Sequence, residues 1–251
     1  MEKLGRYEIL EELGRGGCGV VYKAVDPSIG RTVAIKTIRN DNDNETGELR
    51  ERFRREARSA GNLSHPNIVT IHEFNDSGEI MYIAMEFVDG QTLHHRMRSG
   101  ALPLDFTLLV IRAAAEALDF AHAHNIVHRD VKPANFLINK HGQVKMADFG
   151  IAKLLDSDAG LTSTGMVVGT ARYMSPEQIA AKEVTGRSDQ FSLAVIAYEM
   201  LTGKSPFHGN SWASIMHNIV SAEPPCLTEF RQELDTTTTD VLRKALAKDP
   251  Q

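Results

Sequence analysis

The sequence has very little cysteine: two residues, Cys18 and Cys226, in a chain of 251. Two cysteines build no disulfide framework, and neither lies in a zinc-ligand spacing, so we expect a reducing compartment, the cytoplasm. The chain also lacks an uninterrupted apolar run of 18 residues and an apolar core of signal-peptide length near its start. We therefore expect no membrane span within this chain.

The chain also lacks an excess of positive charge. The chain has 28 lysines and arginines against 33 aspartates and glutamates, for a formal net charge of −5. Domains that bind nucleic acid are usually basic overall, so this balance argues against that class. What remains is an ordinary globular composition, 42% hydrophobic and 24% charged, in a chain long enough for one large domain or two small lobes.

The first 87 residues predict mainly short strands. β-branched and aromatic residues bounded by turn formers recur in five segments. These span residues 7–14, 19–26, 32–39, 68–74 and 80–87. One charged segment, residues 48–63, has apolar residues at helical spacing instead. We predict a small antiparallel sheet that carries one helix.

From residue 88 onward the pattern is mainly helical. Four segments have apolar residues at helical spacing. They span residues 103–125, 186–203, 211–220 and 236–248. The second is apolar on nearly all sides and should be the central helix. The sequence thus predicts an α+β fold with two lobes, residues 1–87 and 88–251, and a cleft between them.

A glycine motif, G-x-G-x-x-G, lies at Gly14, Gly16 and Gly19. In a dinucleotide-binding fold such glycines open a helix. Here Val20 and Val21 continue as a strand, so the glycines lie in a hairpin that can fold over phosphates with its backbone N–H groups. A plain glycine-rich hairpin is the alternative, and the motif alone does not decide between them.

A single lysine, Lys36, lies in the apolar strand pattern of residues 33–36. A lysine that faced inward there would need an anion, whereas strand alternation could equally turn it to solvent. Glu56, in the following helix pattern, faces the same sheet and could hold the head of the lysine in position. Neither residue is diagnostic by itself.

The segment NIVHRDVKPANFLI, residues 125–138, places charged and polar side chains between two apolar runs. Such groups are costly to bury without partners and usually have a chemical task. Asp130 can accept a proton from an attacking hydroxyl group, and Lys132 can neutralise charge on a transferred phosphoryl group. Taken singly, a loop carboxylate is more often a turn cap than a catalyst.

Two oxygen-bearing side chains flank neighbouring strand patterns. Asn135 comes just before residues 136–139, and Asp148 directly follows residues 143–147. A carboxylate and an amide oxygen at neighbouring strand ends suit Mg²⁺, which prefers oxygen ligands and keeps phosphate oxygens among them. Asn135 and Asp148 are therefore the predicted metal ligands.

Five motifs follow one another in a characteristic order. They are GRGGCGVV at 14–21, VAIK at 33–36, HRDVKPAN at 128–135, DFG at 148–150 and GTARYMSPE at 169–177. In this combination the chain resembles a protein kinase, with high specificity and over nearly its whole length. Residues 53–69 and 169–178 are similar to bacterial Hanks-type serine/threonine kinases, although Ser175 stands where most kinases have alanine. The resemblance implies a protein-kinase-like bilobal fold.

The resemblance also implies roles around the reacting phosphate. Asp130 would be the catalytic base, and the hydroxyl of Thr170 would bond the base and Lys132. Asn135 and Asp148 would bind Mg²⁺, or Mn²⁺ in its place. A lysine two residues after the base and the Gly–Thr pair at residues 169–170 are typical of serine/threonine kinases. A segment such as 169–177 is absent from small-molecule kinases, which indicates protein substrates.

ATP is the implied phosphoryl donor, held beneath the glycine hairpin. Lys36 would hold the α- and β-phosphates and pair with Glu56, while Val21, Ala34 and Leu137 would sandwich adenine. The full implied set is Leu13, Gly14, Arg15, Gly16, Gly17, Cys18, Gly19, Val21, Ala34, Lys36, Met85, Glu86, Val88 and Leu137. Within it, main-chain groups of the hinge residues 86 and 88 would bind the edge of adenine, and residue 85 would line the back of the site.

Supporting and regulatory residues follow from the same resemblance. Asp189 and His128 would be internal supports of the catalytic loop. Arg129 and Lys153 could face a phosphate on the segment between residues 148 and 177, where ordinary loop hydroxyls are the alternative. The acceptor candidates for autophosphorylation are Thr162, Ser163 and Thr164.

Two other functions are weighed against an active kinase. A pseudokinase, which binds partners without transferring phosphate, should lack at least one of the four residues that bind ATP, metal or substrate hydroxyl. All four, Lys36, Asp130, Asn135 and Asp148, are present. A nucleotide-gated signalling scaffold would retain them, so only a turnover assay separates it from an enzyme.

Two expectations concern the wider molecule. The family pattern usually continues two residues beyond residue 251 to an arginine that pairs with Glu177, so we expect a C-lobe trimmed at its end. The chain would then be a cytoplasmic domain, either by itself or within a longer membrane-anchored receptor kinase. Bacterial Hanks-type kinases commonly pair back to back through their small lobes, which on this chain would involve Arg6, Ile29 and Glu73 in a weak homodimer.

Overall fold

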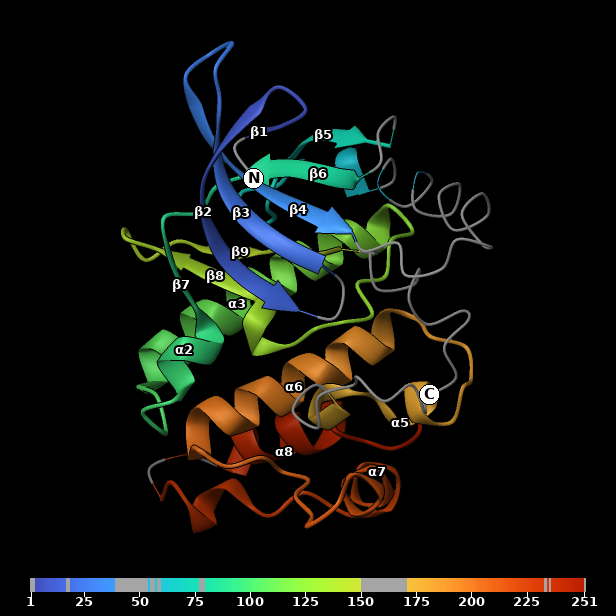
Figure 1. Ribbon diagram of the computed structural model, residues 1–251. Helices are drawn as coiled ribbons and strands as arrows, with labels where there is room; N and C mark the ends of the chain where they lie inside the picture. The colour runs from blue at the N-terminus through green and yellow to red at the C-terminus, as the bar shows by residue number, and fades with distance from the viewer. Residues whose placement is uncertain are drawn as a thin grey trace.

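The computed structural model describes residues 3–16, 19–38, 54, 57, 60–76, 80–149, 171–232, 234 and 236–250. Figure 1 shows a sheet-rich lobe above a helical lobe, as predicted. Several predicted site residues lie outside the described residues, and their roles stay predictions. They are Gly17, Cys18, Glu56, Lys153, Thr162, Ser163, Thr164 and Thr170.

The N-terminal lobe is a six-stranded antiparallel sheet in the order β1-β2-β3-β4-β6-β5. Its strands are β1 (Lys3–Leu4), β2 (Tyr7–Gly16), β3 (Gly19–Asp26), β4 (Arg31–Ile38), β5 (Ile71–Asn75) and β6 (Met81–Glu86). The five predicted strands are present, with a short strand added before them. β5 begins three residues later than predicted, because residues 67–69 bond to a strand of the other lobe.

Side-chain alternation along β4 separates two small cores. Val33 and Ile35 pack with Tyr7 in the apolar cluster on one face of the sheet. Ala34 lies in a different cluster, on the opposite face. Lys36 alternates in step with Ala34 and is 9% exposed. The lysine therefore faces inward, which settles the alternative left open by the sequence.

The C-terminal lobe combines helices with a small three-stranded antiparallel sheet. The helices are α2 (Leu93–Met97), α3 (Leu104–Ala123), α5 (Pro176–Ile179), α6 (Gly186–Thr202), α7 (Trp212–Ser221) and α8 (Thr236–Ala245). The sheet is β7 (Gly90–Thr92), β8 (Phe136–Asn139) and β9 (Val144–Met146), in that order. The four predicted helices are confirmed. In the described part of the chain, no helix combines the length and hydrophobicity needed to cross a bilayer.

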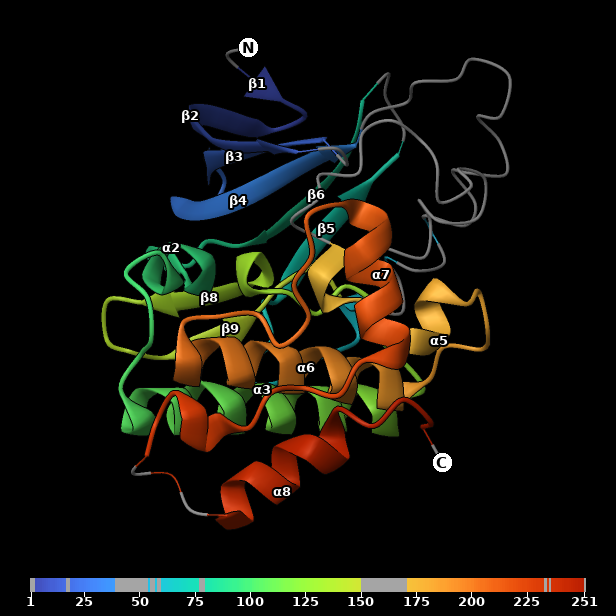
Figure 2. The same ribbon diagram turned by 90° about the horizontal axis from the view of Figure 1, so that it is seen from below.

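α6 is the central helix of the lower lobe (Figure 2). One side of it contributes Ile196 and Met200 to the core shared with α3. The other side contributes Val195 and Tyr198 to the core shared with α7. Because two cores share one helix, its first turn is held at a fixed place, and that turn supports the site.

The ends of α6 are set by local chemistry. Thr185 is the N-cap, and its hydroxyl accepts the N–H of Arg187. Gly203 ends the helix with φ of 71°, a left-handed conformation, and a Cβ atom there would meet the backbone of Ala101 at 2.9 Å. Only glycine fits this stop without strain, so the helix ends one residue before its predicted boundary.

Candidate active site

The catalytic loop is anchored to the first turn of α6. The buried carboxylate of Asp189 accepts the N–H groups of His128 and Arg129, each at 2.8 Å. Arg129 has φ of 68°, an uncommon conformation for a side-chain-bearing residue. Its C=O accepts a hydrogen bond from Gln178 Nε2 at 2.8 Å. Bonds at both ends of one residue hold the strained backbone that leads into Asp130.

His128 connects the catalytic loop to the turn after β9. Its Nε2 lies 3.0 Å from the C=O of Ala147, and its Nδ1 lies 3.3 Å from the N–H of Asp130. The backbone N–H can only donate, so Nδ1 accepts and Nε2–H is the donor to Ala147. The ring also packs against Phe149, with centroids 4.5 Å apart. The expected supporting geometry of Asp189 and His128 is thus present.

Asp130, Lys132 and Asn135 meet at one point. Oδ2 of Asp130 lies 2.7 Å from Nζ of Lys132 and accepts Nδ2 of Asn135 at 3.2 Å. The same Nδ2 donates to the Asp130 C=O at 2.8 Å. The side chains of Asp130 and Lys132 are 26% and 24% exposed, so a hydroxyl group from solution can reach the carboxylate. Since Nδ2 is engaged, Oδ1 is the Asn135 atom left to bind a cation.

Asn135 and Asp148 occupy neighbouring strand ends, as predicted. β8 and β9 are paired, and Ala147, the residue before Asp148, donates its N–H to the Asn135 C=O at 2.9 Å. Asp148 has φ of 66°, so the chain turns sharply there. The two oxygen-bearing side chains therefore lie at the same end of two paired strands, one just before β8 and the other just after β9.

Lys36 forms an ion pair with Asp148, with Nζ 2.8 Å from Oδ2. Burial is the largest single influence and raises the pKa of Asp148, but the charge and hydrogen bond of Lys36 together with nearby cations outweigh it, and the pKa lies below its ordinary value. His128 and Lys132 act in the same direction. Asp148 is therefore an anion at neutral pH. The predicted partner Glu56 lies outside the described residues.

The glycine hairpin has the predicted form. β2 and β3 pair in the register Gly14–Val21, Arg15–Val20 and Gly16–Gly19, and Gly19 has φ of 138°, which favours glycine. The implied adenine residues come together in one apolar cluster. Its members include Val21, Ala34, Met85, Val88 and Leu137. Leu13, at the edge of the hairpin, is 46% exposed.

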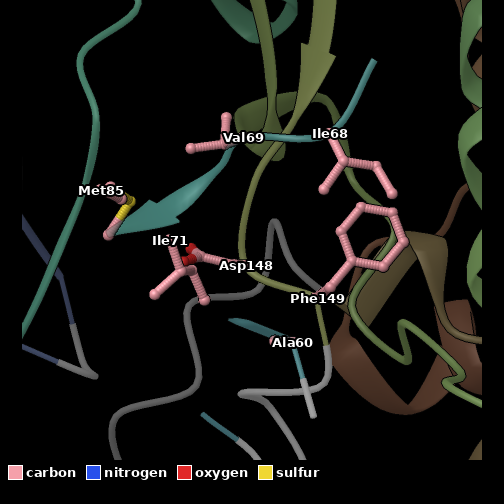
Figure 3. Close-up of a pocket in the computed structure, with 7 residues that line it drawn as sticks. All are labelled: Ala60, Ile68, Val69, Ile71, Met85, Asp148 and Phe149. Atoms are coloured by element: carbon pink, nitrogen blue, oxygen red, sulfur yellow. The ribbon is translucent and has the colours of Figure 1, made fainter. Parts of the chain in front are cut away.

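A small pocket of about 10 Å³, roughly the space of one water molecule, adjoins this apolar cluster, because Met85 belongs to both. Figure 3 shows Asp148 and Phe149 lining it from the turn after β9, together with Ile68, Val69 and Ile71. Its lining residues are Ala60, Ile68, Val69, Ile71, Met85, Asp148 and Phe149. The Asp148 carboxylate thus stands between a mostly apolar cavity and Lys36.

Sequence reasoning missed two residues of this neighbourhood. Gln178, which fixes the Arg129 carbonyl, carries no distinctive signal in the sequence. Lys145 is buried in β9 and forms an ion pair with Glu86, with Nζ 2.9 Å from Oε2. A single lysine in an apolar strand was the signal that drew attention to Lys36, and it applies equally to Lys145.

Comparisons with known proteins agree on one family. The sequence model described as "Protein kinase domain" matches residues 7–251. A probable serine/threonine-protein kinase of Streptomyces coelicolor is 43% identical across 98% of this chain and 37% of its own length. PrkC of Bacillus subtilis is 41% identical across 98% of this chain and 38% of its own. PknA of Mycobacterium tuberculosis is 39% identical across 98% of this chain and 57% of its own.

A solved structure shows the same fold. The kinase domain of Mycobacterium tuberculosis PknI is 31% identical, with a TM-score of 0.76 over 99% of this chain and 90% of that one. The curated relatives named above are longer proteins, of which this chain spans between 37% and 57%. The likeness therefore concerns one domain of those proteins.

Proposed function

The chain belongs to the protein kinase domain family, in its bacterial Hanks-type serine/threonine class, and we propose that it transfers the terminal phosphoryl group of ATP to serine and threonine hydroxyls of proteins. One observation carries the proposal: Asp130, Lys132 and Asn135 meet beside the strand end that holds Asp148, itself paired with Lys36. A pseudokinase should lack at least one of Lys36, Asp130, Asn135 and Asp148, and all four are present.

Asp130 acts as the proton acceptor in this proposal. Its carboxylate is partly exposed and fixed by Asn135 on one side, so it can face an incoming hydroxyl without reorganising. Lys132 forms an ion pair with that carboxylate and would lie where negative charge builds up on the phosphoryl group. Thr170 would add its hydroxyl to the same pair.

A divalent metal ion fits the oxygen ligands at the start of β8 and the end of β9. Asp148 supplies an ionised carboxylate and Asn135 its uncommitted Oδ1, which are the ligand types that Mg²⁺ and Mn²⁺ take. When bound, such a metal neutralises charge on the phosphates of ATP. The affinity of the chain for the ion then depends on Lys36 moving its ammonium from Asp148 towards phosphate oxygens, with Glu56 as the proposed second partner.

The nucleotide base fits the apolar cluster that contains Val21, Ala34 and Leu137. We assign recognition of its edge to main-chain groups of Glu86 and Val88, with Met85 at the back. The hairpin of residues 13–19 would cover the phosphates. This placement puts the base and the phosphates at opposite ends of one cleft.

Regulation and assembly are further parts of the proposal. Thr162, Ser163 and Thr164 are the assigned sites of autophosphorylation, which would order the segment through charge-assisted bonds to cations such as Arg129. We place the domain in the cytoplasm, either by itself or within a longer membrane-anchored receptor kinase. A weak back-to-back homodimer would bring two such domains together.

Mass spectrometry after incubation with MgATP tests the activity and maps the modified hydroxyls at once. We expect phosphate on residues 162–164 of the wild-type chain and on an added protein substrate such as myelin basic protein.

Asp130→Asn should fold and bind MgATP, yet lose at least about a hundredfold in transfer rate, since an amide cannot take the proton. Near-normal transfer by Asp130→Asn would refute the assigned base, and no transfer by wild type would favour the scaffold function.

A further inference from the structure

β9 contains a buried lysine that the proposed chemistry does not use. All three residues of the strand, Val144, Lys145 and Met146, are buried. Successive side chains point to opposite faces of a strand. Val144 and Met146 belong to the core of the C-terminal lobe, so Lys145 faces away from that core. A buried ammonium group is costly unless it is paired and hydrogen-bonded, so its partners indicate its role.

The partners of Lys145 lie where the two lobes join. Its Nζ donates to Oε2 of Glu86 at 2.9 Å and to the C=O of Ile68 at 3.4 Å. Glu86 is the last residue of β6, and its Oε2 also accepts the N–H of Thr70 at 3.2 Å. The N–H of Glu86 donates in turn to the Thr70 C=O at 2.8 Å. Glu86 is therefore fixed through both its side chain and its main chain.

The segment that holds Glu86 is itself bonded to β9. The N–H of Val69 donates to the C=O of Met146, and the N–H of Met146 donates to the C=O of Asn67, both at 2.8 Å. Asn67 Nδ2 adds a bond to the C=O of Val144 at 2.8 Å. Residues 67–70 and β9 thus form one hydrogen-bonded unit. Lys145 joins Glu86 to that unit, two residues before the turn that carries the metal ligand.

We propose that Lys145 is a positioning residue for the nucleotide, because its ion pair with Glu86 sets the place of the hinge main chain relative to the β8–β9 hairpin, which carries Leu137 of the adenine site and leads to Asp148. This inference rests on the proposed binding of ATP. The base would be held by the main chain of Glu86 and Val88, and the phosphates by Lys36 and the metal. A ligand of fixed length needs these two ends at a fixed separation, and small displacements are costly to binding and rate.

The burial of the Lys145–Glu86 pair makes it effective. The two side chains are 11% and 29% exposed, so solvent and salt screen their attraction only in part. The β8–β9 hairpin offers a matched comparison: Nζ of Lys140 lies 2.6 Å from Oδ2 of Asp89, with exposures of 70% and 61%. Exposed pairs of this kind contribute little. Lys140 therefore serves as a control for loss of a lysine from the same hairpin.

The test compares Lys145→Met, Glu86→Gln, the double variant and the control Lys140→Met. Isothermal titration calorimetry gives the Kd of adenosine and of MgATP, and steady-state kinetics give KM for ATP and kcat. Lys145→Met should raise the Kd of adenosine and the KM for ATP by roughly tenfold, the equivalent of one charge-assisted hydrogen bond. At saturating ATP, kcat should stay within about threefold of wild type. Lys140→Met should change neither constant.

The double variant tests whether the two residues act as a pair. If they do, Lys145→Met/Glu86→Gln should bind adenosine no more weakly than the weaker single variant. Lys145→Arg, which keeps the charge, should restore much of the affinity and guards against a Lys145→Met protein that fails to fold.

Three results would overturn the inference, and a fourth bears on the enzyme alone. Unchanged adenosine affinity, with kcat reduced in proportion to the folded fraction, would show that Lys145 only stabilises the fold. Additive losses in the double variant would show that Glu86 is not its partner in this role. A wild-type protein that binds adenosine but phosphorylates nothing would contradict the proposed function while leaving the comparison of adenosine affinities valid, and one that binds no adenosine would refute both proposals.

Discussion

Lys36 and Lys145 are two buried strand lysines for which we propose different roles. Each is a single lysine in an apolar strand, each is 9% exposed, and each has a carboxylate partner. The partner of Lys36 is a predicted metal ligand that nucleotide binding would free. The partner of Lys145 is Glu86, a hinge residue that we propose stays in place when nucleotide binds. Burial predicts that such a lysine is paired, but only the location of its partner shows what the pair does.

The Lys36–Asp148 pair predicts a pH-dependent contribution to stability. The pKa of Asp148 in the folded chain lies below the ordinary value of 3.8. The unfolded chain therefore takes up the proton first as pH falls, and the contribution of Asp148 is present above pH 4 and lost below it. Asp148→Asn should lower the free energy of unfolding by about 1–2 kcal/mol at pH 7. The difference from wild type should shrink as pH falls below about 4.

Urea unfolding followed by tryptophan fluorescence between pH 7 and pH 3 measures this difference. Asp89→Asn provides the control, because the Asp89–Lys140 pair is mostly exposed and its loss should make no measurable change. A difference between wild type and Asp148→Asn that is the same at every pH would show that the ion pair with Lys36 is not its source.

At the scale of elements, the first turn of α6 supports two parts of the site through adjacent residues. Asp189 fixes the catalytic loop through the N–H groups of His128 and Arg129. Ser188 donates its hydroxyl to the buried carboxylate of Glu177, in α5. The sequence led us to expect Glu177 without its usual arginine partner. In the structure, the hydroxyl of Ser188, a neutral donor from α6, forms a hydrogen bond with the carboxylate of Glu177.

Ser188→Ala should therefore destabilise the protein by about 1–3 kcal/mol, because a buried carboxylate loses a donor. Ser192 is the matched control: it is buried in the same helix, and its single O–H is shared between the main-chain carbonyls of Tyr173 at 2.6 Å and Ser188 at 3.0 Å. Ser192→Ala should cost less, about 1 kcal/mol, since no charged group loses a partner. Denaturant unfolding of wild type and both variants measures the free energy of unfolding that each substitution removes. Equal losses would show that the charge of Glu177 adds nothing to the Ser188 bond.

Helices and strands could be predicted from the sequence where they are long enough to show a hydrophobic period. The helices α3, α6, α7 and α8 span ten residues or more and lie within about three residues of their predicted bounds. β1, β7, α2 and α5 span two to five residues and were missed, because such short segments show little period, whereas the equally short β8 and β9 were predicted from the apolar residues beside Asn135 and Asp148. The start of β5 was misplaced because Val69 bonds across the lobes to Met146. A contact between distant parts of the chain leaves no trace in a local pattern.

At the scale of the whole molecule, the structure changes how a back-to-back dimer would be built. Arg6 lies 2.7 Å from Glu73 within one chain and 3.1 Å from Asp26. The hydroxyls of Tyr7 and Tyr82 also donate to the Glu73 carboxylate. An intermolecular Arg6–Glu73 pair would thus have to replace bonds that already exist. Reversing the charge of Glu73 would disturb this cluster, and the result would not report on the dimer alone.

Ile29 is the better probe of the dimer. It lies in the turn between β3 and β4, its side chain is 64% exposed, and an apolar residue there can meet its own copy across a two-fold axis. Ile29→Asp should slow autophosphorylation at low protein concentration several-fold, because two like charges would face each other. A protein already phosphorylated should keep its full activity. The rate of phosphate incorporation, measured across a dilution series, gives the comparison.

Leu108→Asp is the control variant. Leu108 is 58% exposed on α3 in the other lobe, so this variant should behave like wild type. If Ile29→Asp follows the wild-type dilution curve, the first phosphate arrives through another surface.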